Sequence, residues 1–240
     1  GFKSQVFKLK QSFFQDHNIE EFNYYQFHHY RNSDFFFANY IIFAESKNDV
    51  EVIKFLAKSK NIDLDLYDIS LINIDGIKNL PYPFHVVRNL NLPYTIILDK
   101  DYFIPYLNDE LDSSRNSQGL PKYRFEFKNG ILLNDLIQNQ LDQNKFLTFL
   151  KSNHSKVLDH IDKYNIICMN YNLEMDLLCS NQAVVKMSAR LNLNSVQSNR
   201  RFLLVERKKA IKNIGNILHV LDQMPIINLP NSYKRIRNKL

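Results

Sequence analysis

The chain contains very little glycine and no tryptophan. Glycine occurs 5 times in 240 residues. Because glycine adopts positive φ angles at the lowest cost, some positions where it would be comfortable must carry other residues. Since tryptophan is absent, any platform on which a nucleobase stacks has to be built from the 13 tyrosines or the 18 phenylalanines.

Cysteine, membrane and ATP-binding signals are also sparse. The two cysteines, Cys168 and Cys179, favour buried thiols in a reducing compartment over a disulfide, and no Cys/His spacing indicates zinc. No apolar run reaches the length of a membrane span, and no secretory signal is visible, so we expect a cytoplasmic protein without a membrane partner. No GxxxxGK[ST] loop is present, which excludes ATP binding by that route.

The composition is that of a folded, basic protein. Hydrophobic residues make up 45% and charged residues 23% of the 28.5 kDa chain, enough for one large domain or for a domain with a helical appendage. The net charge of +6 and the pI of about 9.1 are compatible with a polyanion partner but do not establish one.

Apolar runs and amphipathic segments alternate along the first half of the chain. We expect strands at 38–44, 70–74 and 94–98 and helices at 49–60 and 84–90, with Asn48 capping the first helix. This order implies a parallel sheet with right-handed crossovers. Further segments continue the pattern: a strand-like alternation at 123–127, helices at 132–150 and 155–163, a fourth core strand at 165–169, and helices at 181–193 and 201–222.

These elements suggest three regions. Residues 1–37 resemble a lead-in from a missing upstream region, and residues 38–222 form the main domain, with a helical insertion at about 103–163. Residues 223–240 form a basic C-terminal tail. Because the chain starts with Gly1 and opens in the middle of a pattern, we expect it to be part of a longer protein.

Acidic residues stand where two predicted strands end. Glu45 and Asp49 follow the first strand, and Asp99 and Asp101 follow the third. Ligands gather at the carboxyl ends of parallel strands, and clustered carboxylates repel one another unless a cation lies among them. Oxygen ligands favour Mg²⁺ or Mn²⁺, which indicates metal-assisted phosphate chemistry.

These residues resemble the Toprim domain of topoisomerases, primases and several nucleases. Glu45 stands where that family has a glutamate, and Asp99 and Asp101 match its DxD pair. The sequence Asp-Phe-Phe-Phe-Ala at 34–38 and the triplet Asn172-Leu173-Glu174 are similar to the OLD (overcoming lysogenization defect) nucleases. The resemblance covers residues 34–102 well and 164–220 loosely.

The resemblance implies an α/β fold: a Toprim, Rossmann-like parallel sheet flanked by helices, with a helical insertion. It also implies about two Mg²⁺ or Mn²⁺ ions, as two-metal catalysis requires. Asp99 and Asp101 alternate along an extended segment, so they can share one ion, which Glu45 also serves unless it takes a proton from water. Asp49, one helical turn beyond Glu45, pairs with Glu174 around the second ion.

A lysine completes the catalytic set that the resemblance implies. Lys208 fits this role best, with Lys209 and Lys212 close behind. Its ammonium group would neutralise the charge that develops on the phosphate.

The implied function is a metal-dependent DNA endonuclease or nickase in bacterial anti-phage defence. The implied partners are DNA and an ATPase domain in the same full-length chain, through which the protein would form a homo-oligomer. The alternative is a catalytically silent Toprim module that binds nucleic acid or recruits a partner. Two departures favour that alternative: Ser46 replaces the glycine usual after the glutamate, and Asn172 is a neutral amide.

Each residue taken singly also has a purely structural interpretation. Asp49 is a plausible acid at a helix N-terminus, and Glu174 and Asp176 open a segment where acids favour the helix dipole. Basic pairs such as Arg200-Arg201 and the basic tail can contact a phosphate backbone or simply form a solvated surface.

Overall fold

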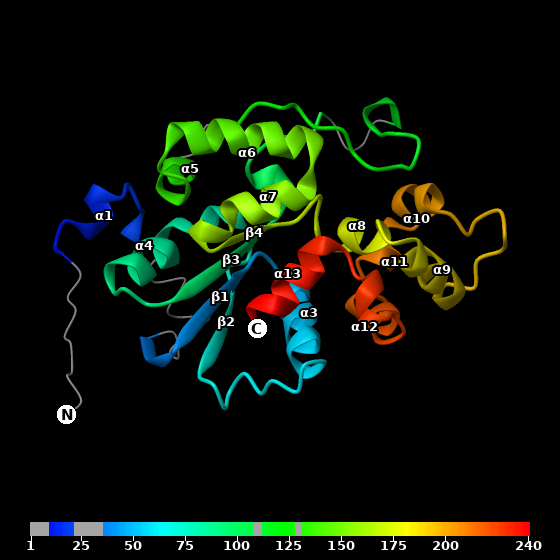
Figure 1. Ribbon diagram of the computed structural model, residues 1–240, viewed down its shortest axis with the longest axis horizontal. Coiled ribbons are helices and arrows are strands. Elements are labelled where there is room, and N and C mark those ends of the chain that lie inside the picture. Colours follow the sequence, from blue (N-terminus) through cyan, green and yellow to red (C-terminus); the bar gives the residue numbers. More distant parts are fainter. Residues whose placement is uncertain (1–9, 22–35, 108–111, 128–130) are drawn as a thin grey trace. The chain divides into compact units, whose positions relative to one another are not determined.

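The sheet of this protein has four strands in the order β2-β1-β3-β4 (Figure 1). The computed structural model describes residues 10–21, 36–107, 112–127 and 131–240. The strands are β1 (Tyr40–Ala44), β2 (Ile69–Asn73), β3 (Tyr94–Leu98) and β4 (Ile166–Cys168). β1 pairs in parallel with β2 and with β3, and Met169 N donates to Leu98 O at 2.8 Å next to β4. The predicted parallel α/β fold is confirmed, while positions 34 and 35 of the resemblance lie outside the described residues.

The chain divides into two compact units. The first comprises residues 1–50 and 63–96. Within it, β1 and β2 carry the buried side chains Ile41, Phe43 and Ile72. Its other elements are α1 (Phe13–Asp16), the start of α3 (Lys47–Lys58), η2 (Ile77–Asn79) and α4 (Pro81–Asn89). The helix α4 begins at a proline, which is pre-organised for the first helical position.

The second unit comprises residues 51–62 and 97–240 and is mostly helical. Between β3 and β4 it contains η3 (Lys100–Tyr102), η4 (Asp112–Ser114), α5 (Ile131–Leu136), α6 (Gln140–Ser152), α7 (His154–Ile161) and η5 (Asp162–Tyr164). After β4 come α8 (Leu173–Leu178), α9 (Asn181–Arg190), α10 (Arg200–Glu206), α11 (Lys208–Ile211), α12 (Ile214–Asp222), η6 (Ile226–Asn228) and α13 (Asn231–Lys239). α7 packs against β4 and against α6, and α9 packs against α12. No helix in the described ranges is long and apolar enough to cross a membrane.

Several expected elements are shorter than the sequence pattern indicates. The helix expected at 132–150 is two helices, because Asn139 caps a new one at α6. The helix expected at 201–222 is three helices, with Asn213 capping α12. The strand expected at 123–127 is wrong: Tyr123 forms one isolated antiparallel bridge with Tyr106, and the alternation has no neighbouring strand to pair with.

Asparagine and aspartate occupy the turns for which glycine is too scarce. In the described part of the chain, every residue other than glycine with a positive φ angle is one of these two: Asn18, Asn61, Asp68, Asp75, Asn91, Asn165 and Asn192. Their short polar side chains tolerate the left-handed conformation better than other residues do. The low glycine content is therefore compensated at the turns.

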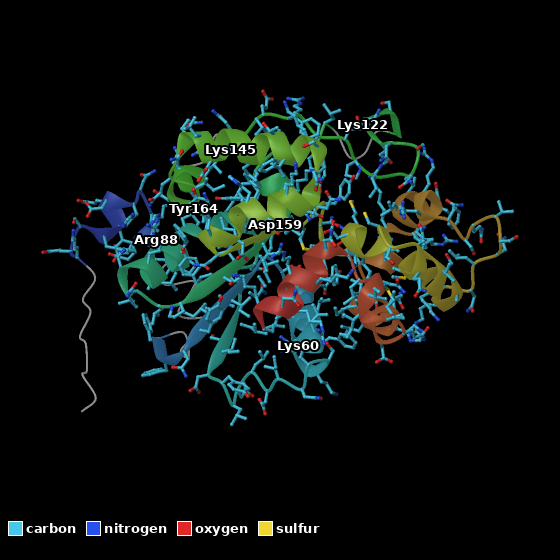
Figure 2. The ribbon with its side chains drawn as sticks, viewed as in Figure 1. Lys60, Arg88, Lys122, Lys145, Asp159 and Tyr164 are labelled. Carbon is cyan, nitrogen blue, oxygen red and sulfur yellow. The ribbon has the colours of Figure 1, made fainter. Side chains whose placement is uncertain are left out.

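The basic segment at the C-terminus forms helix α13, which is docked within the second unit. Tyr233 and Ile236 are buried, and α13 contacts β4 and α7. Arg235 pairs with Asp159 on α7, a residue labelled in Figure 2, and Lys239 Nζ lies 3.0 Å from Asp162 Oδ1. Two of the cations of this segment therefore have acidic partners inside the same unit.

We expect the buried His85 to make stability depend on pH. His85 is 4% exposed and stacks on His17 with ring centroids 3.9 Å apart. Burial, and then the charges of His17 and Arg88, lower the pKa of His85 to about 4. Because the unfolded chain takes up this proton near pH 6.5, stability is full above that pH and is lost as the pH falls towards 4. The loss from one such group is roughly 3 kcal/mol.

The measurement is the free energy of unfolding in urea between pH 7 and pH 4. His85→Phe keeps a ring in the buried site and removes the titration, so its stability should fall less over this range than that of the wild type. Equal pH slopes for the two proteins would contradict the assignment.

Candidate functional site

Glu45 lies directly after β1, at a backbone position that is tightly held. Ile74 N donates to Ala44 O at 2.9 Å, and Gly76 N donates to Glu45 O at 3.0 Å. The turn that follows β2 therefore fixes the end of β1. The Glu45 side chain is half-buried, as expected for a residue at the rim of a sheet.

Asp49 forms a capping box with Ser46 at the start of α3. Asp49 Oδ2 accepts hydrogen bonds from Ser46 N at 2.9 Å and from Ser46 Oγ at 2.6 Å. In return, Asp49 N donates to Ser46 Oγ at 3.4 Å. The expectation that Asn48 caps this helix is wrong, because the helix begins at Lys47 and Asn48 lies inside its first turn. The serine that replaces the glycine usual in the Toprim resemblance thus has a structural role.

Asp99 and Asp101 follow β3, but the segment that carries them is not extended. Asp99 has extended backbone angles and precedes the 3₁₀ helix η3, whose first turn contains Asp101. The alternation argument for their side chains therefore does not apply. The segment is tied to the loop after β4 by a backbone bond in which Lys100 N donates to Tyr171 O at 3.0 Å.

Glu174 lies in the first turn of α8. Asn172 caps this helix, because its side-chain oxygen accepts a hydrogen bond from Met175 N at 3.0 Å. Glu174 is buried, and its Oε1 forms no hydrogen bond within the described part of the chain. The nearest cation is Lys212, whose Nζ lies 3.5 Å from Oε1. This separation makes a long ion pair with an exposed lysine, so it compensates little for the burial of the carboxylate.

The three candidate lysines differ in their surroundings. Lys208 and Lys209 form the first turn of α11, and both side chains are exposed. Lys212, one turn further along, forms the ion pair with Glu174. The structure therefore associates Lys212 with the acidic residues more directly than it does Lys208.

Three of the predicted acids act electrostatically on Tyr106. Burial raises the pKa of Tyr106, and the negative charges of Asp101, Asp99 and Glu174 raise it further. All four residues belong to the second unit. The acids follow β3 and β4, which are neighbours in the sheet although they are far apart in the sequence.

These acids do not form a preformed cation site with three ligands in place. Within the described residues, no group of three or more His, Cys, Asp or Glu side chains has the geometry to hold a metal ion. The nature of the donors fits a hard cation, since carboxylate oxygens are the ligands of Mg²⁺ and Mn²⁺. The buried Glu174 oxygen without a hydrogen bond is the donor most in need of such a partner.

Asp176 has a structural role in the same region. This carboxylate is 1% exposed and accepts hydrogen bonds from Asn170 N and Tyr171 N, each at 2.8 Å, and from Ser232 Oγ. Burial raises the pKa of Asp176 to about 6, although these hydrogen bonds oppose the shift. Asp176 therefore fixes the loop after β4 and connects it to α13.

Lys100 is a residue that the sequence reasoning overlooked. It stands between the two acids of the Asp99-Lys100-Asp101 motif, yet its side chain is buried and only 6% exposed. Its Nζ lies 4.7 Å from the ring centroid of Tyr123 and 5.6 Å from that of Tyr171. Burial lowers the pKa of this ammonium group. The sequence did contain a signal for this residue, because Lys100 stands between the two aspartates of the DxD motif.

The basic pair Arg200-Arg201 is engaged in contacts within the protein. Arg200 donates to Leu178 O at 2.6 Å and to Cys179 O at 3.0 Å. Arg201 donates to Asn116 O at 3.2 Å. These hydrogen bonds hold the loop around residue 116 and the end of α8 against α10, which gives the pair a structural role.

Comparison with protein families identifies the core of this chain. Residues 36–101 match the family model described as overcoming lysogenization defect protein-like, TOPRIM domain. This segment contains Glu45, Asp49, Asp99 and Asp101. The resemblance to the OLD TOPRIM domain is thereby confirmed over these residues, and the triplet at 172–174 lies outside the match. No curated protein sequence matches the chain.

Solved structures with a similar fold come from two bacteria. The C-terminal region of the Xanthomonas campestris pv. campestris OLD protein aligns with a TM-score of 0.50 at 18% identity, over 85% of this chain and 96% of that chain. The C-terminal region of the Burkholderia pseudomallei OLD protein aligns with a TM-score of 0.46 at 17% identity, over 84% and 96%. At these identities the likeness concerns the fold alone.

We expect the Ser46 cap to contribute measurably to stability. Ser46→Ala removes the side-chain half of the capping box and should lower the free energy of unfolding by about 1 kcal/mol. Ser46→Gly is the matched variant, and it should cost only a few tenths of a kcal/mol because glycine is itself accepted at this position. Urea denaturation of the three proteins measures the difference. Equal losses for both variants would contradict the capping role.

We also expect Asp176→Ala to destabilise the protein strongly. The substitution leaves two buried backbone N–H groups and one buried hydroxyl without an acceptor, each at a cost of about 1–3 kcal/mol. Removal of a buried charge offsets part of this, so the net loss should be roughly 3 kcal/mol. The control is Asp222→Ala, at an exposed residue of α12, which should change stability by less than about 0.5 kcal/mol. Similar denaturation midpoints for the two variants would refute the structural role.

Proposed function

We propose that this chain is the nuclease domain of an OLD-like protein, a metal-dependent endonuclease or nickase that hydrolyses DNA phosphodiester bonds. The proposal starts from the TOPRIM family match over residues 36–101. It also requires that acids from separate loops bind divalent cations together, as a phosphodiester hydrolase of this kind needs.

One observation carries the proposal. Asp99 and Asp101 follow β3 and Glu174 follows its neighbour β4, and the two loops are joined by the hydrogen bond from Lys100 N to Tyr171 O at 3.0 Å. Carboxylates on two adjoining loops repel one another, and a divalent cation would relieve the repulsion. The single Glu174 oxygen without a hydrogen bond supports the same interpretation.

We assign Glu45 and Asp49 to the same centre because the TOPRIM family match over residues 36–101 includes them together with Asp99 and Asp101. In this proposal Glu45 binds the cation shared by Asp99 and Asp101 or takes a proton from water, while Asp49 joins Glu174 at the second cation. Both hydrogen bonds from Ser46 go to Asp49 Oδ2, so in this proposal the other carboxylate oxygen, Oδ1, is the one that binds the cation.

The proposed ligands are all carboxylates, which suit either Mg²⁺ or Mn²⁺, and the proposed site holds two such ions. When bound, such ions stabilise the charge on the attacking and leaving oxygens of a phosphodiester. The lysine that neutralises the phosphate is assigned to Lys208 from the resemblance. Lys212 is the competing assignment, because its ammonium group lies beside Glu174.

The wider setting is also part of the proposal. We place the domain in the cytoplasm, acting on DNA in bacterial anti-phage defence. We also propose that the full-length chain contains an ATPase domain and that the protein forms a homo-oligomer through this ATPase domain. The Xanthomonas structure with a similar fold is itself the C-terminal region of an OLD protein, which agrees with this arrangement.

A catalytically silent Toprim module is the second candidate. It is favoured by the lack of a preformed three-ligand site among the described residues. Such a module would still bind nucleic acid or recruit a partner, and it would differ from the nuclease only in lacking cleavage.

A nicking assay on supercoiled plasmid DNA separates the two candidates. We expect nicking in the presence of Mg²⁺ or Mn²⁺ and none in the presence of EDTA. Asp99→Ala should reduce the nicking rate by at least about 100-fold, because it removes a ligand on which transition-state stabilisation depends. Asp222→Asn, which neutralises an exposed acid on α12, is the matched control and should nick at the wild-type rate.

Three results would decide the assignment. Metal-dependent nicking that Asp99→Ala abolishes supports the nuclease. DNA binding without nicking by the wild type supports the silent module. Equal nicking by the wild type and by Asp99→Ala would overturn the proposed site. Lys208→Ala and Lys212→Ala, compared in the same assay, identify the lysine that acts on the phosphate.

A further inference from the structure

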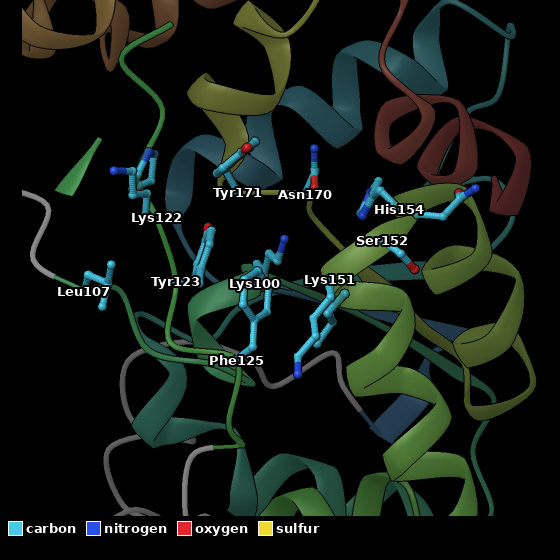
Figure 3. A pocket seen from close by; sticks show the side chains of 13 residues that line it. Lys100, Leu107, Lys122, Tyr123, Phe125, Lys151, Ser152, His154, Asn170 and Tyr171 are labelled. Atoms are coloured by element: carbon cyan, nitrogen blue, oxygen red, sulfur yellow. The ribbon is translucent and has the colours of Figure 1, made fainter. Parts of the chain in front are cut away.

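A pocket of about 510 Å³ lies in the second unit, beside the segment that carries Asp99 and Asp101 (Figure 3). Its size is within the range of about 300–1,000 Å³ that small-molecule sites occupy. The proposed catalytic acids are not part of its wall. Instead, the wall combines lysines with aromatic rings, and these two features indicate what the pocket binds.

Lys100 is the central charged group of the pocket. The side chain is 6% exposed, and its amino group points into the space between Tyr123, Tyr171 and Asn170 in Figure 3. Within the described residues, Lys100 Nζ has neither a carboxylate within 4.0 Å nor a hydrogen bond, and its contacts are with two tyrosine rings. The buried Asp176 carboxylate acts on Lys100 electrostatically without forming an ion pair with it. The burial of the ammonium group is therefore only partly compensated, and an anionic ligand in contact with it would gain electrostatic energy.

The remaining charges of the pocket have the same sign. Lys122 and Lys151 line it, and none of the described residues in its wall is acidic. His154 also lines it, and burial, followed by the charge of Lys100, lowers the pKa of His154 to about 4. The imidazole is therefore neutral at neutral pH, and three lysines supply the positive charge.

Aromatic rings form the rest of the wall. Tyr123 and Tyr171 lie with ring centroids 5.8 Å apart, and Phe125, which is 41% exposed, lies under Lys151 Nζ at 5.8 Å. Proteins that bind single-stranded nucleic acid without sequence preference use exposed aromatic rings next to cations. The rings stack on the bases, and the cations contact the phosphates. The pocket offers both within one cavity.

The pocket adjoins the segment that carries two of the proposed acids. Lys100 stands between Asp99 and Asp101 in the chain, and it lines the pocket. Tyr123, which also forms part of the wall, stacks on Tyr106 with ring centroids 4.8 Å apart. A group bound in the pocket therefore lies next to the segment of Asp99 and Asp101.

We propose that this pocket binds one unpaired nucleotide of a DNA strand, with its phosphate at Lys100, Lys122 and Lys151 and its base against Tyr171 or Phe125. This proposal about the substrate rests on the proposed nuclease function, because it places the bound nucleotide next to the phosphodiester bond that is cut. A base stacked in a protein pocket cannot remain paired, so the preferred substrate has an unpaired nucleotide: a single strand, a flap or a frayed end.

Binding without metal tests the pocket separately from catalysis. The probe is a fluorescently labelled oligothymidine of roughly eight nucleotides, in EDTA, with fluorescence anisotropy as the readout. We expect it to bind more tightly than a blunt duplex of the same length. Lys151→Gln should weaken binding and reduce the slope of log K against log salt by about 0.7, the value for one lost contact with a single-strand phosphate.

Lys145→Gln is the matched control. Lys145 belongs to the same helix, α6, is exposed, and does not line the pocket (Figures 2 and 3). The Lys145→Gln substitution should leave unchanged both the affinity for oligothymidine and the slope of log K against log salt. Equal effects of Lys145→Gln and Lys151→Gln would mean that α6 attracts DNA only through its overall charge, and this would overturn the pocket.

Aromatic substitutions test the position of the base. Tyr171→Leu and Phe125→Leu keep an apolar side chain and remove the ring, so at least one of them should weaken oligothymidine binding by about 5-fold to 150-fold, the range for one lost stacking contact. Competition with thymidine monophosphate, thymidine and inorganic phosphate distinguishes a nucleotide site from a simple anion site. Competition by phosphate that equals competition by the monophosphate would overturn the nucleotide assignment.

Lys100→Met gives the clearest separation of a binding role from a structural one. If Lys100 contacts the phosphate of the bound nucleotide, replacing it by an apolar residue of similar length should weaken oligothymidine binding by the folded variant. If the ammonium group serves only to hold the tyrosines and to compensate Asp176, the variant should be less stable but binding by the folded protein should be unchanged, and the proposal would be wrong. Oligothymidine binding by the wild type without metal-dependent plasmid nicking would instead contradict only the proposed nuclease function.

Discussion

The buried carboxylate of Asp176 is the contact on which the arrangement of this region depends. It accepts hydrogen bonds from the backbone N–H groups of Asn170 and Tyr171 and from Ser232 on α13. Tyr171 O in turn accepts from Lys100 N, so the loop after β4 holds the loop after β3. One buried acid therefore sets the positions of Asp99 and Asp101 through two successive hydrogen-bonded steps. The elevated pKa of Asp176, about 6, reflects the cost of burying this charge.

Three consecutive residues after β3 carry opposite charges into different surroundings. The 3₁₀ turn buries the side chain of Lys100, whose Nζ lies 4.7 Å from the ring centroid of Tyr123, while Asp99 and Asp101 remain half-buried. Hydrolysis of a phosphodiester needs cations at the bond that is cut and a grip on the neighbouring nucleotide. In our proposals the two acids meet the first requirement, and Lys100 contributes to the second.

The two departures from the Toprim resemblance are both helix caps. Ser46 replaces a glycine and forms a capping box with Asp49, and Asn172 caps the helix that carries Glu174. Each cap fixes the first turn of a helix whose acid belongs to the proposed site. The substitutions therefore stabilise the elements that present the acids, and by themselves they do not indicate that catalysis has been lost.

The sequence by itself determined the order of strands and helices and the acids at the strand ends. Apolar runs that end at Glu45 and Asp99 predict buried parallel strands, since burial on both faces leaves no room for polar alternation. It could not predict the cap at Ser46, the turn after Asp99 or the burial of Lys100, because these depend on where a helix starts and on what packs above it. Only the tertiary structure decided that Asp176 supports the loops while Glu174 keeps an oxygen without a hydrogen bond. Two acids on the same short helix look equivalent in sequence, and the groups that surround each of them make the difference.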